Sequence, residues 1–474
     1  MSDYIYMLES HLSPDQNRAV AVVQRAAGEA GLNLFLTGGA MRDMRAGFRI
    51  RDLDFVVEGN ALLLTKAVTA AGASLVSTDE ARKSVALLFS GGVTAEIAMA
   101  RREKPGRAGA KPQITPATIQ EDLRGRDFTC NAIALSLNKA SRGLLLDPLN
   151  GLADIERREL RGASPYAFYD DPGRLLRLIR FRVRLGFTVE ERTQTQAANA
   201  RESGVARSIS GRVLGEELKQ IAWEDSPAEI LTLLEESQLL GLFSPALAGP
   251  KLNLPGILKL EKGVRLIPSD MFPRSARLGP FLSALTEKLS TRERQALAKA
   301  VDLSKSDLAE WQKLPARAKK LETALRSPRI RKPSQVYHLV SAAALDEILF
   351  LLYHSALKPV QDRLRNHFQK YLPAVQAITA EEWAQVEGAA LSGDLKSSPK
   401  LQKARHEFIT RRLDRRPPKP PPAPEETPAA APAPQAAPAG NPPSQGSAGT
   451  PPRGSGWRTQ PGAAPRRARA SQSW

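Results

Sequence analysis

Two aspartates separated by one residue are the first feature of this sequence that could do chemistry. Asp52 and Asp54 stand in "IRDLDFVVEG" (50–59), at the start of an apolar run typical of a β-strand. Alternate side chains of a strand share a face, so both carboxylates point one way while Leu53 and Phe55 face the core. Mg²⁺ prefers one or two carboxylates together with substrate phosphates. The pair therefore predicts a divalent-metal site, and the alternative is a strand end that meets solvent.

A third carboxylate and a glycine turn strengthen this prediction. Glu96 lies in "TAEIAMA" (94–100), among apolar neighbours, where an unpaired charge is costly. Three carboxylates on adjacent strands would form a two-metal site that activates a hydroxyl and stabilises a pyrophosphate leaving group. Upstream, "LFLTGGAMRD" supplies a strand, the pair Gly38 and Gly39, and a helix start that favours phosphate. Arg42, on the first helical turn, is a further phosphate partner.

The elements that must position these residues follow from the hydrophobic pattern. Apolar runs and glycine signals predict helices over 17–31 and 40–46, and strands over 32–36, 84–90, 94–100 and 131–137. The strands 84–90 and 94–100 are joined by "GG", a hairpin signal. A basic loop, "KPGRAGAKPQ" (104–113), follows. After about residue 160 the strand signals fade and long runs have helical spacing, so an α+β head followed by an all-helical remainder is expected.

Composition narrows the class of protein. The 474 residues carry a net charge of +18, which favours a polyanionic partner. A single cysteine, Cys130, excludes an intrachain disulfide and fits a cytoplasmic location. No run of 18 apolar residues exists, the N-terminus lacks a signal pattern, and the five histidines show no zinc spacing. The residues 417–474 hold 16 of the 36 prolines, which predicts a disordered tail, and 1–416 keep a charge of +14.

Five ordered motifs carry a resemblance to a known family. They are "GGAMRD…RDLDFVV", "EIAMARRE", "EDLRGRDFTCNAIAL", "LLLDPLNGLADI" and "DDPGRLLRLIRFRVRLGF". In this order they resemble the class II tRNA nucleotidyltransferases and bacterial poly(A) polymerases, over about residues 20–240. The resemblance implies a nucleotidyltransferase head with a small mixed β-sheet and helices (1–150), and then an all-helical neck (151–240). An RNA-binding body and tail (241–416) and the disordered tail (417–474) complete the predicted domains.

The enzymes of this family transfer nucleotides to an RNA 3′-hydroxyl without a template, and the resemblance implies roles for single residues in this reaction. Asp52 and Asp54 match the metal-binding pair, and Glu96 matches the glutamate of the following strands. The triphosphate-contacting turn corresponds to Gly38, Gly39 and Arg42. "RGRDFTCNA" matches the motif that contacts ribose and phosphate, through Arg126, Asp127 and Asn131. The implied cofactor is Mg²⁺, and the implied partners are tRNA, CTP and ATP, with no membrane and no protein partner.

The family's base-selecting motif is an acidic pair, two spacers and an arginine, here Asp170 to Arg174. Cytosine and adenine both present an exocyclic amine beside an unprotonated ring nitrogen. The Asp171 carboxylate can accept from the amine while Arg174 donates to the ring nitrogen. Guanine and uracil would leave these groups mispaired. Asp171 and Arg174 are expected on one helix face, with Arg177 and Arg180 continuing towards the phosphates.

Three departures from the family pattern and several alternatives remain. Asp170 replaces the usual glutamate, Gly125 stands where arginine is common, and Met41 where valine is common. The loop 104–112 disfavours a CC-only enzyme, since its absence accompanies CC-only addition in the family. CCA addition to tRNA is therefore expected; A-only addition and poly(A) addition stay open. An inactive RNA-binding protein that keeps the fold is the alternative from another class. No P-loop or GxGxxG motif supports a kinase or a dinucleotide enzyme.

Overall fold

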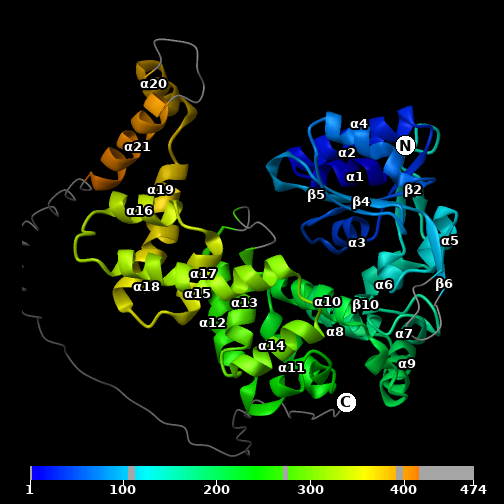
Figure 1. Cartoon of the computed structure of the whole chain (residues 1–474). Coiled ribbons are helices and arrows are strands. Elements are labelled where there is room, and N and C mark those ends of the chain that lie inside the picture. The colour runs from blue at the N-terminus through cyan, green and yellow to red at the C-terminus, as the bar shows by residue number, and fades with distance from the viewer. Residues whose placement is uncertain (1–2, 105–112, 269–270, 272–275, 391–398, 416–474) are drawn as a thin grey trace, which may run out of the picture. The chain divides into compact units, whose positions relative to one another are not determined.

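A computed structural model describes residues 3–104, 113–268, 271, 276–390 and 399–415 (Figure 1). The chain from Met1 to Asp414 forms one compact unit. The predicted disordered tail and most of the predicted basic loop lie outside the described residues. The bounds of the four predicted domains stay predictions.

A seven-stranded mixed sheet organises the N-terminal part of the chain. Its strands follow the order β3-β4-β5-β2-β1-β8-β9. Their bounds are β1 Asn33–Thr37, β2 Leu53–Glu58, β3 Ser74–Asp79, β4 Ser84–Leu88, β5 Thr94–Met99, β8 Ala134–Ser136 and β9 Leu145–Leu146. The central pair β2 and β5 is parallel, and every other neighbouring pair in this sheet is antiparallel. A separate two-stranded ribbon joins β6 Arg101–Lys104 to β7 Gln113–Pro116.

The two faces of this sheet have different roles. On one face Leu34, Leu36, Phe55 and Val57 belong to the main hydrophobic core. Figure 1 shows α2 and α4 along the sheet, and α2 and α3 contact β1 and β2. The helices of this part are α1 Asp3–His11, α2 Pro14–Glu29, α3 Gly39–Ala46, α4 Thr65–Ala70 and α5 Ile119–Arg124. The opposite face carries Asp54, and α5 covers only its downstream end, so the carboxylate end stays open.

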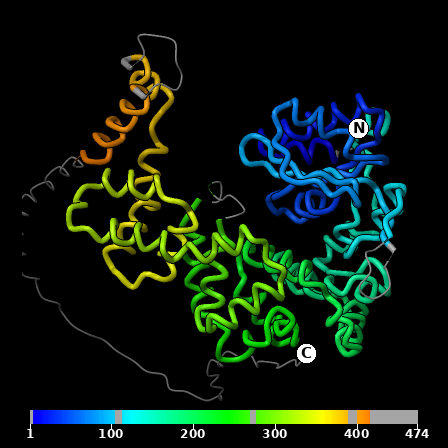
Figure 2. Tube along the Cα trace, in the orientation of Figure 1, coloured from blue at the N-terminus to red at the C-terminus, as the bar shows by residue number. Residues whose placement is uncertain are grey.

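Helices make up most of the remaining chain, as the change of trace in Figure 2 from strands to coils shows. After β9, the one strand pair among the described residues is the short parallel pair β10 Glu159–Leu160 and β11 Thr188–Val189. The helices after the sheet are α6 Gly151–Arg157, α7 Ala167–Asp170, α8 Arg174–Leu185, α9 Glu191–Glu202, α10 Gly211–Trp223, α11 Pro227–Glu236, α12 Leu254–Leu266, α13 Leu278–Leu285, α14 Thr291–Ala300, α15 Lys305–Arg326, α16 Pro333–Ser341, α17 Leu345–His354, α18 Lys358–Asn366, α19 Leu372–Gln376, α20 Ala380–Ala390 and α21 Pro399–Asp414. The predicted α+β head with a helical remainder is confirmed.

None of the described helices is by itself long and apolar enough to cross a bilayer. The pair α16 and α17 passes the length and composition criteria together, with a bend of 116° between its members. In α17 the apolar residues are buried in the hydrophobic core, as in a core helix of any helical protein.

The expected elements around the site are mostly confirmed. The hairpin exists as β4 and β5, which pair antiparallel from Ser84 with Ala98 to Leu88 with Thr94. The expected strand 131–137 is shorter: Asn131 ends a 3₁₀ turn, and only 134–136 pair in the sheet. The side chain of Asn131 explains this difference, since it is held by Arg42 and Asp127 outside the sheet.

Candidate active site

The two aspartates lie where the central strands begin. Asp54 is the second residue of β2, Asp52 precedes the strand, and alternation places both carboxylates on the same face. The Oδ1 atom of Asp52 accepts a hydrogen bond from the Thr94 hydroxyl at the start of β5. Asp54 is half-buried. The geometry thus keeps the pair together at the open end of the sheet.

Glu96 joins this pair through the parallel register of the central strands. It is the Cα partner of Asp54 across the β2–β5 ladder, so the two carboxylates share a face. The expectation that Glu96 is a buried mid-strand charge is wrong, because its side chain is exposed. The apolar neighbours Ala95 and Ile97 point to the opposite, covered face. Solvent can therefore hydrate the Glu96 carboxylate, and no partner within the protein is required.

The environment of Asp54 disfavours its negative charge. The pKa of the Asp54 carboxyl is raised from its ordinary value of 3.8 to about 6, chiefly by burial and then by the negative charges of Glu96 and Asp43. Arg126 and Arg42 oppose this effect, but they do not outweigh it. A carboxylate with excess negative charge nearby is suited to a bound cation.

The glycine turn lies directly beside Asp54. A Cβ atom built on Gly38 or Gly39 would stand 3.8 or 3.7 Å from Asp54 Oδ2. Gly38 adopts φ +65°, a conformation that L side chains rarely adopt, and its N–H donates to the Ile133 carbonyl at 3.1 Å. The N-terminus of α3 therefore lies beside the face that carries the predicted metal-binding pair, as a triphosphate site would require.

Arg42 is bound within the protein. Its side chain is buried, donates to Asn131 Oδ1 and to Asp43 Oδ1 at 2.8 Å, and lies 4.9 Å from the Phe181 ring. Asn131 in turn donates to Asp127 Oδ1 at 2.9 Å. The expected direct phosphate contact of Arg42 is not supported by this placement. Its positive charge still acts on Asp54, since it lowers the pKa of that carboxyl.

Arg126 and Asp127 occupy opposite sides of the same turn. Arg126 donates to Asp122 Oδ2 through Nε at 2.9 Å and Nη2 at 2.7 Å, and its charge lowers the pKa of Asp54. Asp127 accepts hydrogen bonds from Asn131 and, at 3.3 Å, from Arg177 of α8. Although burial raises the pKa of Asp127, these partners hold it below its ordinary value. Asp127 therefore stays charged and joins the sheet domain to α8.

The base-selecting pair is arranged differently from the expectation. Asp171 follows α7 with extended φ/ψ and does not share a helix with Arg174, which begins α8. Asp171 Oδ1 accepts from the Gly173 N–H at 3.0 Å, and Oδ2 accepts from Arg177. Arg174 Nη2 donates to the Gly125 carbonyl at 2.7 Å. Its Nε is buried, lies 3.8 Å from Asp171 Oδ2 and has no hydrogen-bond partner among the described residues.

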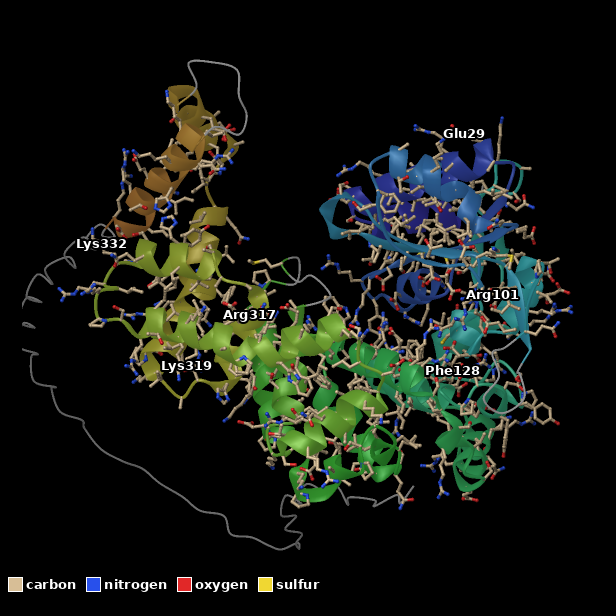
Figure 3. The ribbon with its side chains drawn as sticks, in the orientation of Figure 1. Glu29, Arg101, Phe128, Arg317, Lys319 and Lys332 are labelled. Atoms are coloured by element: carbon tan, nitrogen blue, oxygen red, sulfur yellow. The ribbon has the colours of Figure 1, made fainter. Side chains whose placement is uncertain are left out.

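Arg180 lies apart from the other motif arginines. It is buried and donates to Glu217 and Glu224, at 2.9 Å and 3.3 Å for the shortest contacts. The expectation that it continues towards the phosphates is not supported, because these carboxylates occupy its guanidinium. Phe181, the next residue, packs edge-on against Phe128, labelled in Figure 3, at 5.8 Å between ring centroids.

Several residues of this site carried no signal in the sequence. Thr94, Asp43, Arg184, Glu217 and Glu224 all contact predicted site residues or their neighbours. Asp43, Thr94 and Arg184 stood inside quoted segments, but their residue types and spacing assigned them no role. The glutamates of α10 and its C-terminal end come from a different part of the chain, so spacing could not have identified them.

The residues present fit a divalent cation only in part. Among the described residues no group of three or more His, Cys, Asp or Glu side chains is arranged to hold a metal ion. The closely spaced pair Asp52 and Asp54, with the raised pKa of Asp54, fits the two protein carboxylates that Mg²⁺ takes alongside substrate phosphates. Glu96 is a neighbour of this pair that could join when substrate is bound.

The raised pKa of Asp54 predicts how the stability of the metal-free protein changes with pH. The unfolded carboxyl ionises near pH 4 and the folded one near pH 6, so stability falls as pH rises between these values. Asp54→Asn should therefore raise the free energy of unfolding by about 2–3 kcal/mol near pH 8 and change little below pH 4. Urea unfolding with chelator checks this, and added Mg²⁺ should stabilise only the parent protein.

Asp79→Asn is the control with the opposite sign. Asp79 accepts hydrogen bonds from the backbone and side chain of Arg82, which lower its pKa. Its replacement should lower stability near pH 8. Equal effects of the two substitutions would contradict the environment described for Asp54.

The sequence of this chain is similar to those of several known proteins. Residues 34–161 match the family model "Poly A polymerase head domain". An A-adding tRNA nucleotidyltransferase of Aquifex aeolicus is 37% identical over 210 residues, which cover 44% of this chain and 25% of the relative. An A-adding tRNA nucleotidyltransferase of Halalkalibacterium halodurans is 33% identical over 248 residues, covering 51% and 58%. The chain thus spans between a quarter and about three fifths of these relatives.

A third relative is covered more fully. A CC-adding tRNA nucleotidyltransferase of Deinococcus radiodurans is 30% identical over 307 residues, covering 63% of this chain and 78% of the relative. The fold is shared with a solved CCA-adding enzyme in an apo form, with a TM-score of 0.50 and 23% identity, covering 87% of this chain and 95% of that one. The five motifs, the mixed-sheet head and these matches show that the chain belongs to the tRNA nucleotidyltransferase and poly(A) polymerase family.

Proposed function

We propose that this protein transfers CMP and AMP from CTP and ATP to the 3′ end of tRNA without a nucleic-acid template. One observation carries the proposal: the glycine turn lies beside Asp54, and Arg177 binds both Asp127 and Asp171 of the predicted base-selecting motif. The names of the relatives support the tRNA substrate and the two nucleotides, since they include A-adding and CC-adding tRNA nucleotidyltransferases.

The reaction joins the RNA 3′-oxygen to the α-phosphorus of the nucleotide and breaks the bond from that phosphorus to the β-phosphate, releasing pyrophosphate. Asp52 and Asp54 would hold Mg²⁺, which when bound lowers the pKa of the attacking hydroxyl and neutralises phosphate charge. The N–H groups at Gly38 and Gly39 bind the triphosphate at the start of α3. Arg126 supplies positive charge that acts on Asp54. Glu96 adds a third carboxylate at the open face.

The proposed base selection uses the hydrogen-bonding groups of Asp171 and Arg174 that other residues of the protein do not satisfy. The Arg174 Nε donor has no hydrogen-bond partner among the described residues, and a buried donor of this kind is costly unless a ligand satisfies it. Asp171 keeps acceptor capacity beyond its bonds to Gly173 and Arg177. Together they offer an acceptor for an exocyclic amine and a donor for a ring nitrogen, the pattern shared by cytosine and adenine.

A second candidate is A-only addition. The three relatives given first in the sequence comparison are all A-adding enzymes, at 28–37% identity. The base site itself does not separate the two activities, because cytosine and adenine present the same pair of groups. Poly(A) polymerase activity and an inactive RNA-binding protein are the remaining alternatives.

Nucleotide transfer is tested on three tRNA forms, ending before the CCA sequence, after its first cytidine and after its second. A CCA-adding enzyme extends all three when given CTP and ATP, whereas an A-only enzyme extends just the third, with ATP.

Asp52→Ala and Asp54→Ala should each abolish transfer in Mg²⁺, because a metal-binding carboxylate is lost without any core side chain. Repeated addition of A would indicate a poly(A) polymerase. No transfer by the parent protein to any form would overturn the proposed function.

Base choice is tested with all four triphosphates on Asp171→Asn. The asparagine amide offers a donor where the carboxylate offered none, so UTP and GTP should gain relative to CTP and ATP. The loss of one charge-assisted bond is worth about 1.5–3 kcal/mol, or roughly ten- to more than a hundredfold in selectivity. Asp170→Asn is the matched control, since this neighbouring side chain is exposed, and it should leave the preference unchanged. Unchanged preference in Asp171→Asn would mean that the base is selected elsewhere.

We propose further that the part of the tRNA away from its 3′ end contacts a basic pocket in the helical region predicted over 241–416. The pocket has a volume of about 410 Å³ and lies between α12, α17 and α18, with Lys259, Lys262 and Arg365 on its wall and no carboxylate in its lining. These three cations have no ion-pair partner among the described residues. Gln361 fixes the wall by donating to the Leu351, Leu352 and Ser355 carbonyls.

Replacing Lys262 and Arg365 together with alanine should weaken tRNA binding and lower its dependence on salt. Each lost phosphate contact reduces the slope of log K against log salt by about 0.7–0.9. The double variant Arg25→Ala with Lys66→Ala removes the same charges from exposed sites on α2 and α4 and serves as the control. Equal salt slopes for both double variants, measured by filter binding, would exclude the pocket as a specific contact.

A further inference from the structure

The residue immediately before Asp52 is tied to a distant helix. Arg51 donates through Nη1 to Glu224 Oε2 at 2.8 Å and through Nη2 to Asp225 Oδ2 at 3.3 Å. Both acids follow the C-terminal end of α10, more than 170 residues further along the chain. The backbone that leads into β2, and with it the position of Asp52, is therefore held from outside the sheet.

Glu224 is the centre of this connection. Its side chain is 3% exposed, and its second oxygen, Oε1, accepts from Arg180 Nη1 of α8 at 3.3 Å. Each oxygen of one buried carboxylate thus binds an arginine from a different element. Asp225, by contrast, is 72% exposed and also lies 3.6 Å from Arg277. The buried and the exposed partner of Arg51 are adjacent in sequence.

The connection continues along α8 to the base-selecting motif. Arg180 also binds Glu217 of α10, through Nε at 2.9 Å and Nη2 at 3.3 Å. Glu217 Oε1 lies 3.7 Å from Arg177 Nε, and Arg177 binds Asp171. Charged contacts therefore lead without interruption from Asp171 to the residue before Asp52.

The end of α10 that carries Glu224 is itself fixed. Arg277 donates to the Trp223 carbonyl at 2.8 Å, and its guanidinium lies 4.6 Å from the centre of the Trp223 ring. Because Trp223 is held in this way, the backbone at Glu224 is held in place, and the carboxylate can position both Arg51 and Arg180. A buried pair with two arginines is costly to assemble, and the best-attested use of such groups is to specify one arrangement of the elements that carry them.

We infer that Glu224 is a positioning residue of the transfer reaction, which holds the start of β2, and Asp52 with it, in a set place relative to the α8 face that carries Arg174 and Arg177. This inference rests on the proposed function. According to this inference, Glu224 sets the distance between the proposed metal-binding groups and the proposed base-selecting groups. Nucleotide binding needs only one of these groups in place, whereas transfer needs both, so kcat should suffer more than KM.

The test compares Glu224→Gln with Asp225→Asn, which remove one negative charge each from the two partners of Arg51. Glu224→Gln should lower kcat per folded molecule by about tenfold or more, since misplacement of about 1 Å can cost a hundredfold, with a nearly unchanged KM for nucleotide. Asp225→Asn should match the parent protein. Circular dichroism at each assay temperature gives the folded fraction. An unchanged kcat in folded Glu224→Gln would overturn the inference.

A readout without activity uses Mn²⁺ binding, followed by electron paramagnetic resonance without RNA or nucleotide. Glu224→Gln should weaken Mn²⁺ binding, and Arg51→Met combined with Glu224→Gln should be no worse than Arg51→Met alone. Additive losses would overturn the inference. If Glu224→Gln does not fold, Arg51→Lys carries the test, because Arg51 is 25% exposed and lysine keeps the charge without the two-pronged contact. A parent protein that binds Mn²⁺ with this coupling but transfers no nucleotide would overturn the proposed function alone.

Discussion

Asp127 accepts hydrogen bonds from Asn131 of the sheet domain and from Arg177 of α8, and the rest of the site depends on this shared carboxylate. Asn131 is bound to Arg42, whose charge reaches Asp54, and Arg177 is bound to Asp171. Without the Asp127 charge, the arginines on the polar face of α8 would repel one another in a partly buried place. The opposite charge keeps them ionised, since it raises the pKa of Arg177 although burial opposes this.

Most of the fold and the core of the site could be predicted from the sequence because the signals are local. Alternation along one strand placed Asp52 and Asp54 on a common face, and a glycine pair before a helix placed the turn. Asp171 and Arg174 were also identified locally, but their helix was not, since the proline and glycine between them delay the start of α8 to Arg174. The register that pairs Asp54 with Glu96 is a property of the folded sheet.

The roles of Arg42 and Arg180 show where local reasoning stops. An arginine on the first turn of a helix or along a basic helix face has the same appearance whether it binds a phosphate or an acid of its own chain. What decides is a partner far along the chain: Asn131 lies 89 residues from Arg42, and Glu224 lies 44 residues from Arg180. The relatives place the family, but the partners of these arginines emerge only from the folded structure.

The contrast between Asp54 and Glu96 indicates how such a site is kept ready for its ligand. Asp54 is desolvated and has a raised pKa, whereas Glu96, its register partner, is exposed. A strand pair that held three buried carboxylates would pay the full cost of their repulsion before any cation arrived. With one carboxylate desolvated and one solvated, that cost is confined to a single residue, and the cation proposed to bind here would offset it. The arginine contacts around the site then have a second purpose, since they keep the carboxylate that bears the cost in place while the site is empty.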